Sequence, residues 1–286
     1  MRIKIGCEIG LYVPVATPMI SLLSVHPSRV GDLERPDELF VTPDTPVTRY
    51  RDGFGNWCSR LILPPGETRF GMSNVVSDSG QPDAWDKDAA QDPVEALPDQ
   101  VIEYLLPSRF CESDLLMQEA WGLFGGITGG WARVQAICDY ANGRLTFDYA
   151  TARPTRTAAE AHNERIGVCR DFTHLAIALC RAMNLPTQYC TGLISDIGQK
   201  PPYASMDFAA WMRVFIGGRW WDFDPRNNRP MTGRILFAVG RDAADVPLTH
   251  TFGWHNLTHF KTWCEEVGGD PAMAQAPAMS FGRATQ

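Results

Sequence analysis

The chain has 286 residues, a formal net charge of −7 and a hydrophobic fraction of 44%. This length suits one large or two ordinary domains, and the composition is that of a folded globular protein. A net negative chain without runs of Lys and Arg argues against binding to nucleic acid or to anionic membranes. Its longest apolar stretches are well short of the ~20 residues that a membrane-spanning helix needs. We therefore expect neither a nucleic-acid partner nor a membrane partner.

The N-terminus and the cysteines indicate a cytoplasmic protein. Glu8 interrupts the apolar core that a signal peptide would need. The eight cysteines include no C-x-x-C pair, so we expect neither a metal site nor another cofactor. Thiols in a long cytoplasmic chain are expected to be reduced and mostly buried.

The N-terminal part has the pattern of strands broken by prolines and turns. Residues 3–15 and 19–25 are rich in β-branched and apolar residues. Asp52-Gly53 lies between two further strand-like runs, which is a hairpin signal. These features predict an antiparallel β-domain over residues 1–80.

A polar linker is expected over residues 81–98, and helical patterns follow it within a core domain over residues 99–267. Predicted helices cover 113–124, 129–142, 157–164 and 169–184, and predicted strands cover 187–193, 209–216, 219–223 and 234–239. Residues 268–286 are rich in Ala, Pro, Gly and Met and are expected to be a disordered tail.

Cys169 begins the strongest predicted helix, directly after a turn that contains Gly167. The free amides and positive dipole end of a helix N-terminus favour thiolate, so we expect the pKa of Cys169 to be lowered. The same amides can stabilise an oxyanion on an attacked carbonyl. The alternative is that Cys169 is simply a small apolar residue at a helix start.

Five short stretches and the N-terminal region carry a resemblance to a known family. The run G-V-C-R-D-F-T-H-L-A-I-A-L-C, from Gly167, resembles the nucleophile helix of the transglutaminase-like superfamily. D-F-A-A-W, from Asp207, and G-G-R-W-W-D-F-D, from Gly217, resemble the two-stranded hairpin of that family. L-P-S-R, from Leu106, and G-R-D-A-A-D-V, from Gly240, resemble bacterial members, whose N-terminal β-region the first 80 residues also resemble.

The resemblance implies an α+β fold. It would consist of the N-terminal antiparallel β-domain and a papain-like transglutaminase core, in which the Cys-bearing helix packs on an antiparallel sheet. It also implies acyl-transfer chemistry on a peptide or protein substrate, as a hydrolase or a transamidase. Cys169 and Asp224 occupy catalytic positions of the family. The residues expected to line the cleft are Trp211, Asp207 and Arg226.

The histidine of the family triad is missing, because Ala209 occupies its position. Some bacterial relatives keep a histidine after the second strand instead, but here Asn227 stands there. With Gly217-Gly218 as the hairpin turn, Ile216 pairs with Arg219, and Ala209 falls diagonally opposite Asp224 on one face. Without a histidine to orient, Asp224 has the alternative role of capping the turn at the end of its strand.

His250 and His255 are the substitute bases that we consider, although a structural or surface role is the ordinary one for any histidine. Three alternative functions are compatible with these sequence features. The first is an acyl-transfer enzyme that uses Cys169. The second is a catalytically degenerate pseudoenzyme that binds a peptide-like ligand in the same cleft. The third is a structural or assembly protein that makes its contacts through the β-domain.

Overall fold

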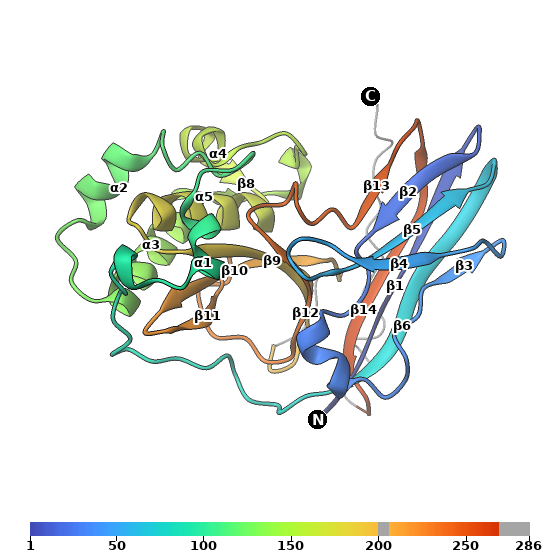
Figure 1. Ribbon diagram of the computed structural model, residues 1–286, viewed down its shortest axis with the longest axis horizontal. Coiled ribbons are helices and arrows are strands. Elements are labelled where there is room, and N and C mark those ends of the chain that lie inside the picture. The colour runs from blue at the N-terminus through green and yellow to red at the C-terminus, as the bar shows by residue number, and fades with distance from the viewer. Residues whose placement is uncertain (200–205, 269–286) are drawn as a thin grey trace.

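The computed structural model describes residues 1–199 and 206–268. The expected disordered tail, apart from Gly268, lies outside the described residues. Figure 1 shows two halves side by side, one made mostly of strands and the other of helices packed on a sheet. This arrangement confirms the predicted α+β fold with a Cys-bearing helix on an antiparallel sheet.

The β-half consists of two four-stranded antiparallel sheets, in the orders β14-β1-β6-β3 and β13-β2-β5-β4. The strands are β1 (Arg2–Val13), β2 (Thr17–Ser21), β3 (Phe40–Thr42), β4 (Thr48–Arg51), β5 (Trp57–Leu63), β6 (Gly66–Ser77), β13 (Thr249–Thr251) and β14 (Asn256–Glu266). A short 3₁₀ helix, η1 (Pro27–Asp32), follows β2. The predicted hairpin at Asp52-Gly53 joins β4 to β5.

The C-terminal strands belong to the β-half, which corrects the expected placement of all residues 99–267 in the core. β14 runs antiparallel to β1 from Ile3↔Glu266 to Tyr12↔Asn256, and β13 pairs with β2. The expected division of the chain into consecutive domains missed this pairing, because strand partners that lie far apart in the sequence leave no local pattern.

The core half contains a further four-stranded antiparallel sheet, with strand order β11-β10-β9-β12. Its strands are β9 (Thr187–Ile194), β10 (Ala209–Ile216), β11 (Arg219–Phe223) and β12 (Arg234–Gly240). The helices are α1 (Asp99–Ile102), α2 (Met117–Phe124), α3 (Gly130–Arg144), α4 (Ala158–Glu164) and α5 (Cys169–Ala182), with 3₁₀ turns η2 (Val94–Ala96), η3 (Glu103–Leu105) and η4 (Tyr149–Thr151). A short parallel pair, β7 (Thr146–Phe147) and β8 (Ile166–Gly167), precedes α5.

The β10–β11 hairpin has the predicted register, with Ile216 opposite Arg219 and Met212 opposite Phe223. Because side chains alternate along a strand, the hairpin presents two different faces. Met212 and Val214 pack with α5 in the larger hydrophobic core. Trp211 faces the other way and packs with Cys190 and other residues of the sheet.

The sheet connects the two halves of the molecule. Helices α2, α3 and α5 contribute to the core on one of its faces. At the end of the sheet, Leu193, Ile235 and Phe237 pack in one cluster with Ile3 and Ile5 of the β-half. Figure 1 shows α5 lying across β9 and β10 with the β-half beyond β12. The position of Cys169 thus depends on a sheet whose residues pack against both halves of the molecule.

The expected linker, residues 81–98, is packed along the core sheet. Asp83 accepts a hydrogen bond from the amide of Met231 at 2.9 Å and pairs with Arg234 at 2.9 Å. The side chain of Gln91 donates to the carbonyl of Met183 at 2.9 Å. These contacts give the segment a fixed course between the two halves.

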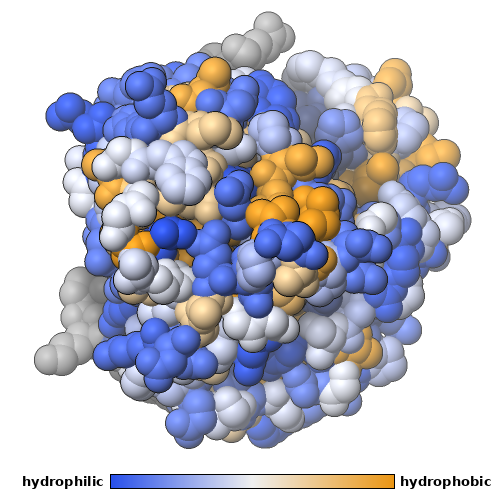
Figure 2. Space-filling model, turned by 60° about the vertical axis from the view of Figure 1, so that its left-hand side comes forward, coloured by the Kyte–Doolittle hydropathy of each residue, from blue (hydrophilic) through white to orange (hydrophobic). Residues whose placement is uncertain are grey.

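Helix α2 is buried along one side only. Ala120 and Phe124 are buried, whereas Met117, Trp121 and Leu123 are exposed. Figure 2 shows the face of the molecule on which the helices come forward as largely hydrophilic, with hydrophobic residues gathered in compact groups. The apolar residues of α2 are thus divided between the core and the surface.

Gly6 offers a test of the contact between β1 and β14. A Cβ atom at this position would lie 2.1 Å from the ring of Trp263 and 2.6 Å from the carbonyl oxygen of Met72. We expect Gly6→Ala to lower the free energy of unfolding by about 3 kcal/mol, because strands on both sides must move. Gly31→Ala is the control, since a Cβ there meets nothing within 4 Å. Equal urea midpoints for the two variants would contradict the packing described.

Candidate active site

The start of α5 is built by a glycine and an aspartate that flank Cys169. The carboxylate of Asp171 accepts a hydrogen bond from the backbone N–H of Val168 at 3.0 Å and so closes the first turn. Gly167 is needed beside it, because a Cβ at 167 would lie 2.6 Å from the Cβ of Asp171. The G-V-C-R-D sequence therefore fixes Cys169 as the first residue of the helix.

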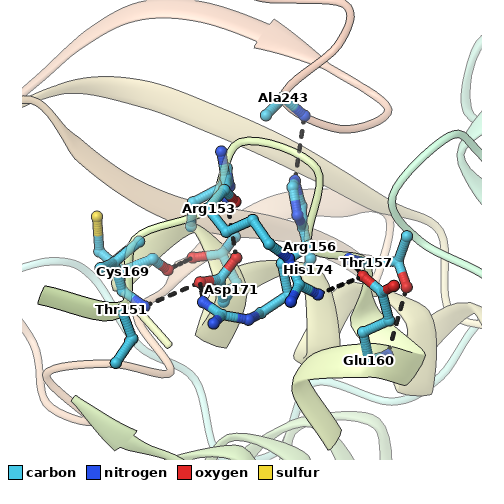
Figure 3. A network of polar contacts seen from close by, with 12 residues as sticks. Thr151, Arg153, Arg156, Thr157, Glu160, Cys169, Asp171, His174 and Ala243 are labelled. Atoms are coloured by element: carbon cyan, nitrogen blue, oxygen red, sulfur yellow. Dashed lines mark hydrogen bonds and ion pairs between the residues drawn. The ribbon is translucent and has the colours of Figure 1, made fainter. Parts of the chain in front are cut away.

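Asp171 is also the centre of a buried ionic network. Its Oδ2 atom lies 2.9 Å from Nη1 of Arg156, and the two side chains are 0% and 4% exposed. Arg156 pairs in addition with Glu164 at 2.9 Å, and Arg170 lies 3.2 Å from Oδ1 of Asp171. Figure 3 shows Arg153, Arg156 and Asp171 gathered beside the helix start, while the sulfur of Cys169 points away from them.

Cys169 is the one cysteine of the eight that is not buried. Even so, its surroundings raise the pKa of its thiol to about 12, first through burial and then through the negative charge of Asp207. Hydrogen bonds from the backbone N–H groups of Ala210 and Arg170, and the positive charge of Arg226, act in the opposite direction and are outweighed. The expected lowering of the pKa by the helix end was therefore wrong, because desolvation dominates.

Asp207 is the acidic group that acts most strongly on Cys169. Burial raises the pKa of its carboxyl to about 6, and the backbone N–H of Phe208 partly offsets this by donating to Oδ1 at 2.7 Å. The carboxyl thus changes its charge near neutral pH, beside the thiol. Asp207, expected only to line the cleft, has the properties of a proton acceptor.

Tyr149 in η4 is a further neighbour that the sequence analysis missed. Burial raises the pKa of its hydroxyl, and the negative charges of Cys169 and Asp207 raise it further. The hydroxyl is therefore protonated at neutral pH and can act as a hydrogen-bond donor. No motif surrounds Tyr149, and only the folding of its segment toward the start of α5 reveals the contact.

Arg226 is exposed, and its guanidinium lies 4.4 Å from the ring centroid of Phe147. It donates to the side chain of Asn227 at 2.6 Å rather than pairing with an aspartate. Its charge favours the thiolate of Cys169. Arg226 therefore belongs to the surroundings of the thiol.

Asp224 is buried and engaged in contacts of its own. Its carboxylate accepts from the backbone N–H and the side chain of Asn227, at 2.9 and 2.8 Å, and lies 3.5 Å from Arg234. These contacts match the turn-capping alternative for Asp224. Its role as a catalytic residue stays a prediction.

Ala209 and Trp211 occupy the strand that approaches Cys169. Ala209 pairs with Gly192 of β9 and is half-buried, and the next amide, that of Ala210, reaches the sulfur. Trp211 is fully buried and donates from Nε1 to Asp222 at 2.8 Å. Trp211 therefore packs in the interior and does not line an open cleft.

The two proposed substitute bases lie in the C-terminal part of the β-half, His250 on β13 and His255 in the connection between β13 and β14. His250, in β13, pairs with Ile20 of β2, and its ring contacts that of Phe252. His255 is exposed and bonds through Nδ1 to the hydroxyl of Thr251 at 2.6 Å. The interactions described for these histidines do not include Cys169, so their role as bases has no geometric support here.

His174 lies inside α5 and is fully buried. Its Nε2 atom accepts from the backbone N–H of Ala243 at 3.2 Å, and its ring stacks on Phe110. Burial and the charges of Arg170 and Arg181 lower its pKa well below the usual value, so it is neutral. It serves to dock the 240–246 loop onto the helix.

The remaining motifs of the resemblance have structural roles. Arg181 of α5 is buried and donates to the carbonyls of Leu106, Thr187 and Arg241, at 3.1, 2.8 and 2.5 Å. Asp242 accepts from the backbone N–H of Phe110 at 2.7 Å. These bonds tie the L-P-S-R and G-R-D segments to the far end of the nucleophile helix.

Comparison with known proteins agrees with this architecture. Residues 122–225 match the model of the transglutaminase-like superfamily. The crystal structure of a candidate cysteine protease from Cytophaga hutchinsonii superposes with a TM-score of 0.80 at 28% identity, over 98% of this chain and 94% of that chain. Uncharacterized proteins from Mycobacterium leprae and Mycobacterium bovis are 31% and 34% identical over 44% and 40% of this chain.

The matches cover only 46% and 40% of the lengths of these two mycobacterial proteins. The fold, the family match and the helix-borne cysteine together identify residues 122–225 as a transglutaminase-like domain. Within residues 1–199 and 206–268, no helix combines the length and apolar character needed to cross a membrane. In the same residues, no group of His, Cys, Asp and Glu side chains is arranged to hold a metal ion. The cytoplasmic location stays a prediction.

Removal of the Asp171 charge should destabilise the protein. We expect Asp171→Asn to lower the free energy of unfolding by about 3 kcal/mol, since it removes the buried charge that pairs with Arg156 and leaves that guanidinium with the partly exposed Glu164. Urea denaturation followed by circular dichroism measures the change. Glu34→Gln, which removes an exposed partner of Arg2, is the control and should have little effect. If the two variants unfold alike, Asp171 does not hold the helix start.

Alkylation of the native protein tests the state of the Cys169 thiol. We expect Cys169 to react with iodoacetamide before the other seven thiols, because it alone is partly exposed. Its rate should rise about tenfold per pH unit through the neutral range without a plateau, since only the thiolate reacts. Peptide mapping gives the site and the rate, with Cys169→Ala as the blank. A plateau of the alkylation rate near neutral pH would show that the effect of the helix end on the pKa of Cys169 outweighs the effect of burial.

Proposed function

We propose that the protein is an acyl-transfer enzyme in which Cys169 is the nucleophile and Asp207 replaces the missing histidine as the base. The observation that carries this proposal is that the charge of Asp207, a carboxyl whose pKa is about 6, acts on Cys169, the one cysteine that is not fully buried. Above that pH the carboxylate is ionised and can accept the thiol proton. Hydrolysis and transamidation both begin with this step.

In the proposed mechanism, the Cys169 sulfur attacks the acyl carbon while its proton passes to the carboxylate of Asp207. An S–C bond forms, the bond to the leaving group breaks, and the leaving group takes the proton back. The backbone N–H groups of Arg170 and Ala210 stabilise the developing thiolate. The protonated hydroxyl of Tyr149 is available to the leaving group. Water or an amine then attacks the thioester and releases Cys169.

The two pKa values restrict the substrates. Moving the proton from a thiol of pKa about 12 to a carboxylate of pKa about 6 costs on the order of 8 kcal/mol. That cost adds to the barrier of the acyl-transfer step. We therefore propose activated acyl groups, such as thioesters and esters, as substrates in preference to peptide amides.

Asp207→Asn should affect two reactions of Cys169 in opposite directions. Loss of the negative charge should speed alkylation by roughly threefold or more, because it lowers the pKa of the thiol. Loss of the base should slow hydrolysis of a model thioester by roughly 10²–10⁴-fold and remove the rise of the wild-type rate near pH 6.

Asp196→Asn is the matched control. Burial raises the pKa of Asp196 as well, but the effects on Cys169 do not include it. This variant should change neither rate. If Asp207→Asn slowed alkylation and hydrolysis together, Asp207 would be supporting the fold instead of accepting a proton.

A second candidate function is binding of a peptide-like ligand without turnover. It is favoured by one observation, namely that none of the six histidines takes part in the interactions described for Cys169. In that case Cys169→Ala would leave ligand affinity unchanged, because the thiol would do no chemistry.

Ala209→His tests whether the site is a degenerate form of a cysteine hydrolase. We expect the variant to cleave a peptide amide faster than the wild-type protein, since an imidazole at this position precedes the amide that reaches the Cys169 sulfur. The additional change Cys169→Ala should abolish the gain. If a crystal structure of the variant places the imidazole beside the sulfur and peptide cleavage is still no faster, the site is not a degenerate form of a cysteine hydrolase.

A further inference from the structure

A second polar site lies on the face of the core sheet that is turned away from α5. It is a cavity of about 320 Å³ between the hairpin β10–β11, the start of β12 and the 78–84 segment. This volume is at the lower end of the range for small-molecule pockets. The charged residues that line it are Arg29, Asp78, Asp83, Arg213, Asp222 and Arg234.

The aspartates of the cavity have their acceptors occupied. Asp78 accepts from the backbone N–H of Gly80 at 2.9 Å and from Arg29 at 3.1 Å. Asp83 accepts from the backbone N–H of Met231 and from Arg234, each at 2.9 Å. Both carboxylates are therefore neutralised by arginine and held by backbone amides.

Asp222 is engaged in the same way. Its Oδ1 atom accepts from Nε1 of Trp211 and from Nε of Arg213, each at 2.8 Å. The charge of Arg213, followed by that of Arg234, lowers the pKa of Asp222 and outweighs the effect of burial, so the carboxylate is ionised.

The arginines, in contrast, keep unused donors. The side chain of Arg234 is 5% exposed, yet its Nη1 has no hydrogen-bond partner within the described part of the chain. Arg213 donates to Asp222 through Nε alone among the described residues, which leaves both of its Nη groups available. An unpaired buried donor such as Nη1 of Arg234 is costly, so the site is suited to a ligand that accepts from it, while the Nη groups of Arg213 are partly exposed to the solvent.

The arginines and aspartates of the lining balance in formal charge, and the charge of Arg213 also acts on His26 beside the cavity. The backbone N–H of His26 donates to the carbonyl of Leu236, a residue that lines the cavity. Burial, followed by the charges of Arg213 and Arg51, lowers the pKa of His26 to about 4. The imidazole is therefore neutral at physiological pH and adds no charge of its own.

We propose that this cavity binds a small anionic oxyacid, a phosphate or a carboxylate, through both Nη groups of Arg213 and Nη1 of Arg234. A planar guanidinium with two free N–H groups matches the oxygens of such a group in a bidentate arrangement. The site lies on the opposite face of the sheet from the helix-bearing core, so its ligand does not compete for Cys169. Its occupancy is a property separate from the proposed acyl transfer.

Titration of the full-length protein with inorganic phosphate and with citrate tests the proposal. Isothermal titration at constant ionic strength, with chloride as the reference anion, should show one saturable site for at least one of the two probes. Tighter binding of phosphate would identify a phosphorylated ligand, and tighter binding of citrate a carboxylate ligand.

Three variants locate the site. Arg213→Lys keeps the charge but loses the guanidinium, so binding should weaken by roughly tenfold. Ser79→Trp fills the cavity from its exposed rim without touching the ion pairs, and it should abolish binding. Arg60→Gln, which removes an exposed charge on β5, should leave binding unchanged.

The proposal fails if neither probe saturates, or if Ser79→Trp binds as tightly as the wild-type protein. Ser79→Trp decides the matter even if Arg213→Lys proves unstable, because it preserves the pairs of Arg213 and Arg234. An equal thermal stabilisation of the wild-type protein and both cavity variants would indicate only the general effect of salt on folded proteins.

Discussion

The buried contact between Asp171 and Arg156 is the interaction on which the site depends. One carboxylate closes the first turn of α5 and at the same time neutralises a guanidinium that water does not reach. Asp171 thereby connects the loop that precedes α5 to the first turn of the helix. The close approach of Gly167 to Asp171 leaves the chain little freedom at the residue that carries the thiol. This arrangement fixes the position of Cys169 but does not lower the pKa of its thiol.

The chemistry of Cys169 is decided by a competition between burial and local fields. A helix end, two amides and Arg226 favour the thiolate, but desolvation and Asp207 outweigh them. A papain-like site meets the same difficulty with a histidine that takes the proton and becomes positively charged. In the mechanism that we propose, the base is instead the carboxylate of Asp207, which becomes neutral when it accepts the proton. The negative charge would then leave Asp207 only when the reaction begins.

The elements of this fold that have local causes could be predicted from the sequence. The cap at Thr157, the start of α5 at Cys169 and the register of the hairpin at Gly217-Gly218 follow from patterns a few residues long. The place of β14 and the electrostatic effect of Cys169 on Tyr149 depend on segments brought together from separate parts of the chain. The pKa of Cys169 could not be predicted for the same reason, since its desolvation comes from the neighbours that tertiary folding supplies.

The pairing of β14 with β1 has a consequence for the order of folding. β1 lies between β6 and β14, so one of its edges is completed early in the chain and the other only by residues more than two hundred positions later. During synthesis on the ribosome, the first strand emerges long before its second partner exists. Contacts of such long sequence separation slow folding, and an uncovered strand edge is a place where other chains can pair. The half of the molecule that begins the chain is thus among the last parts to be completed.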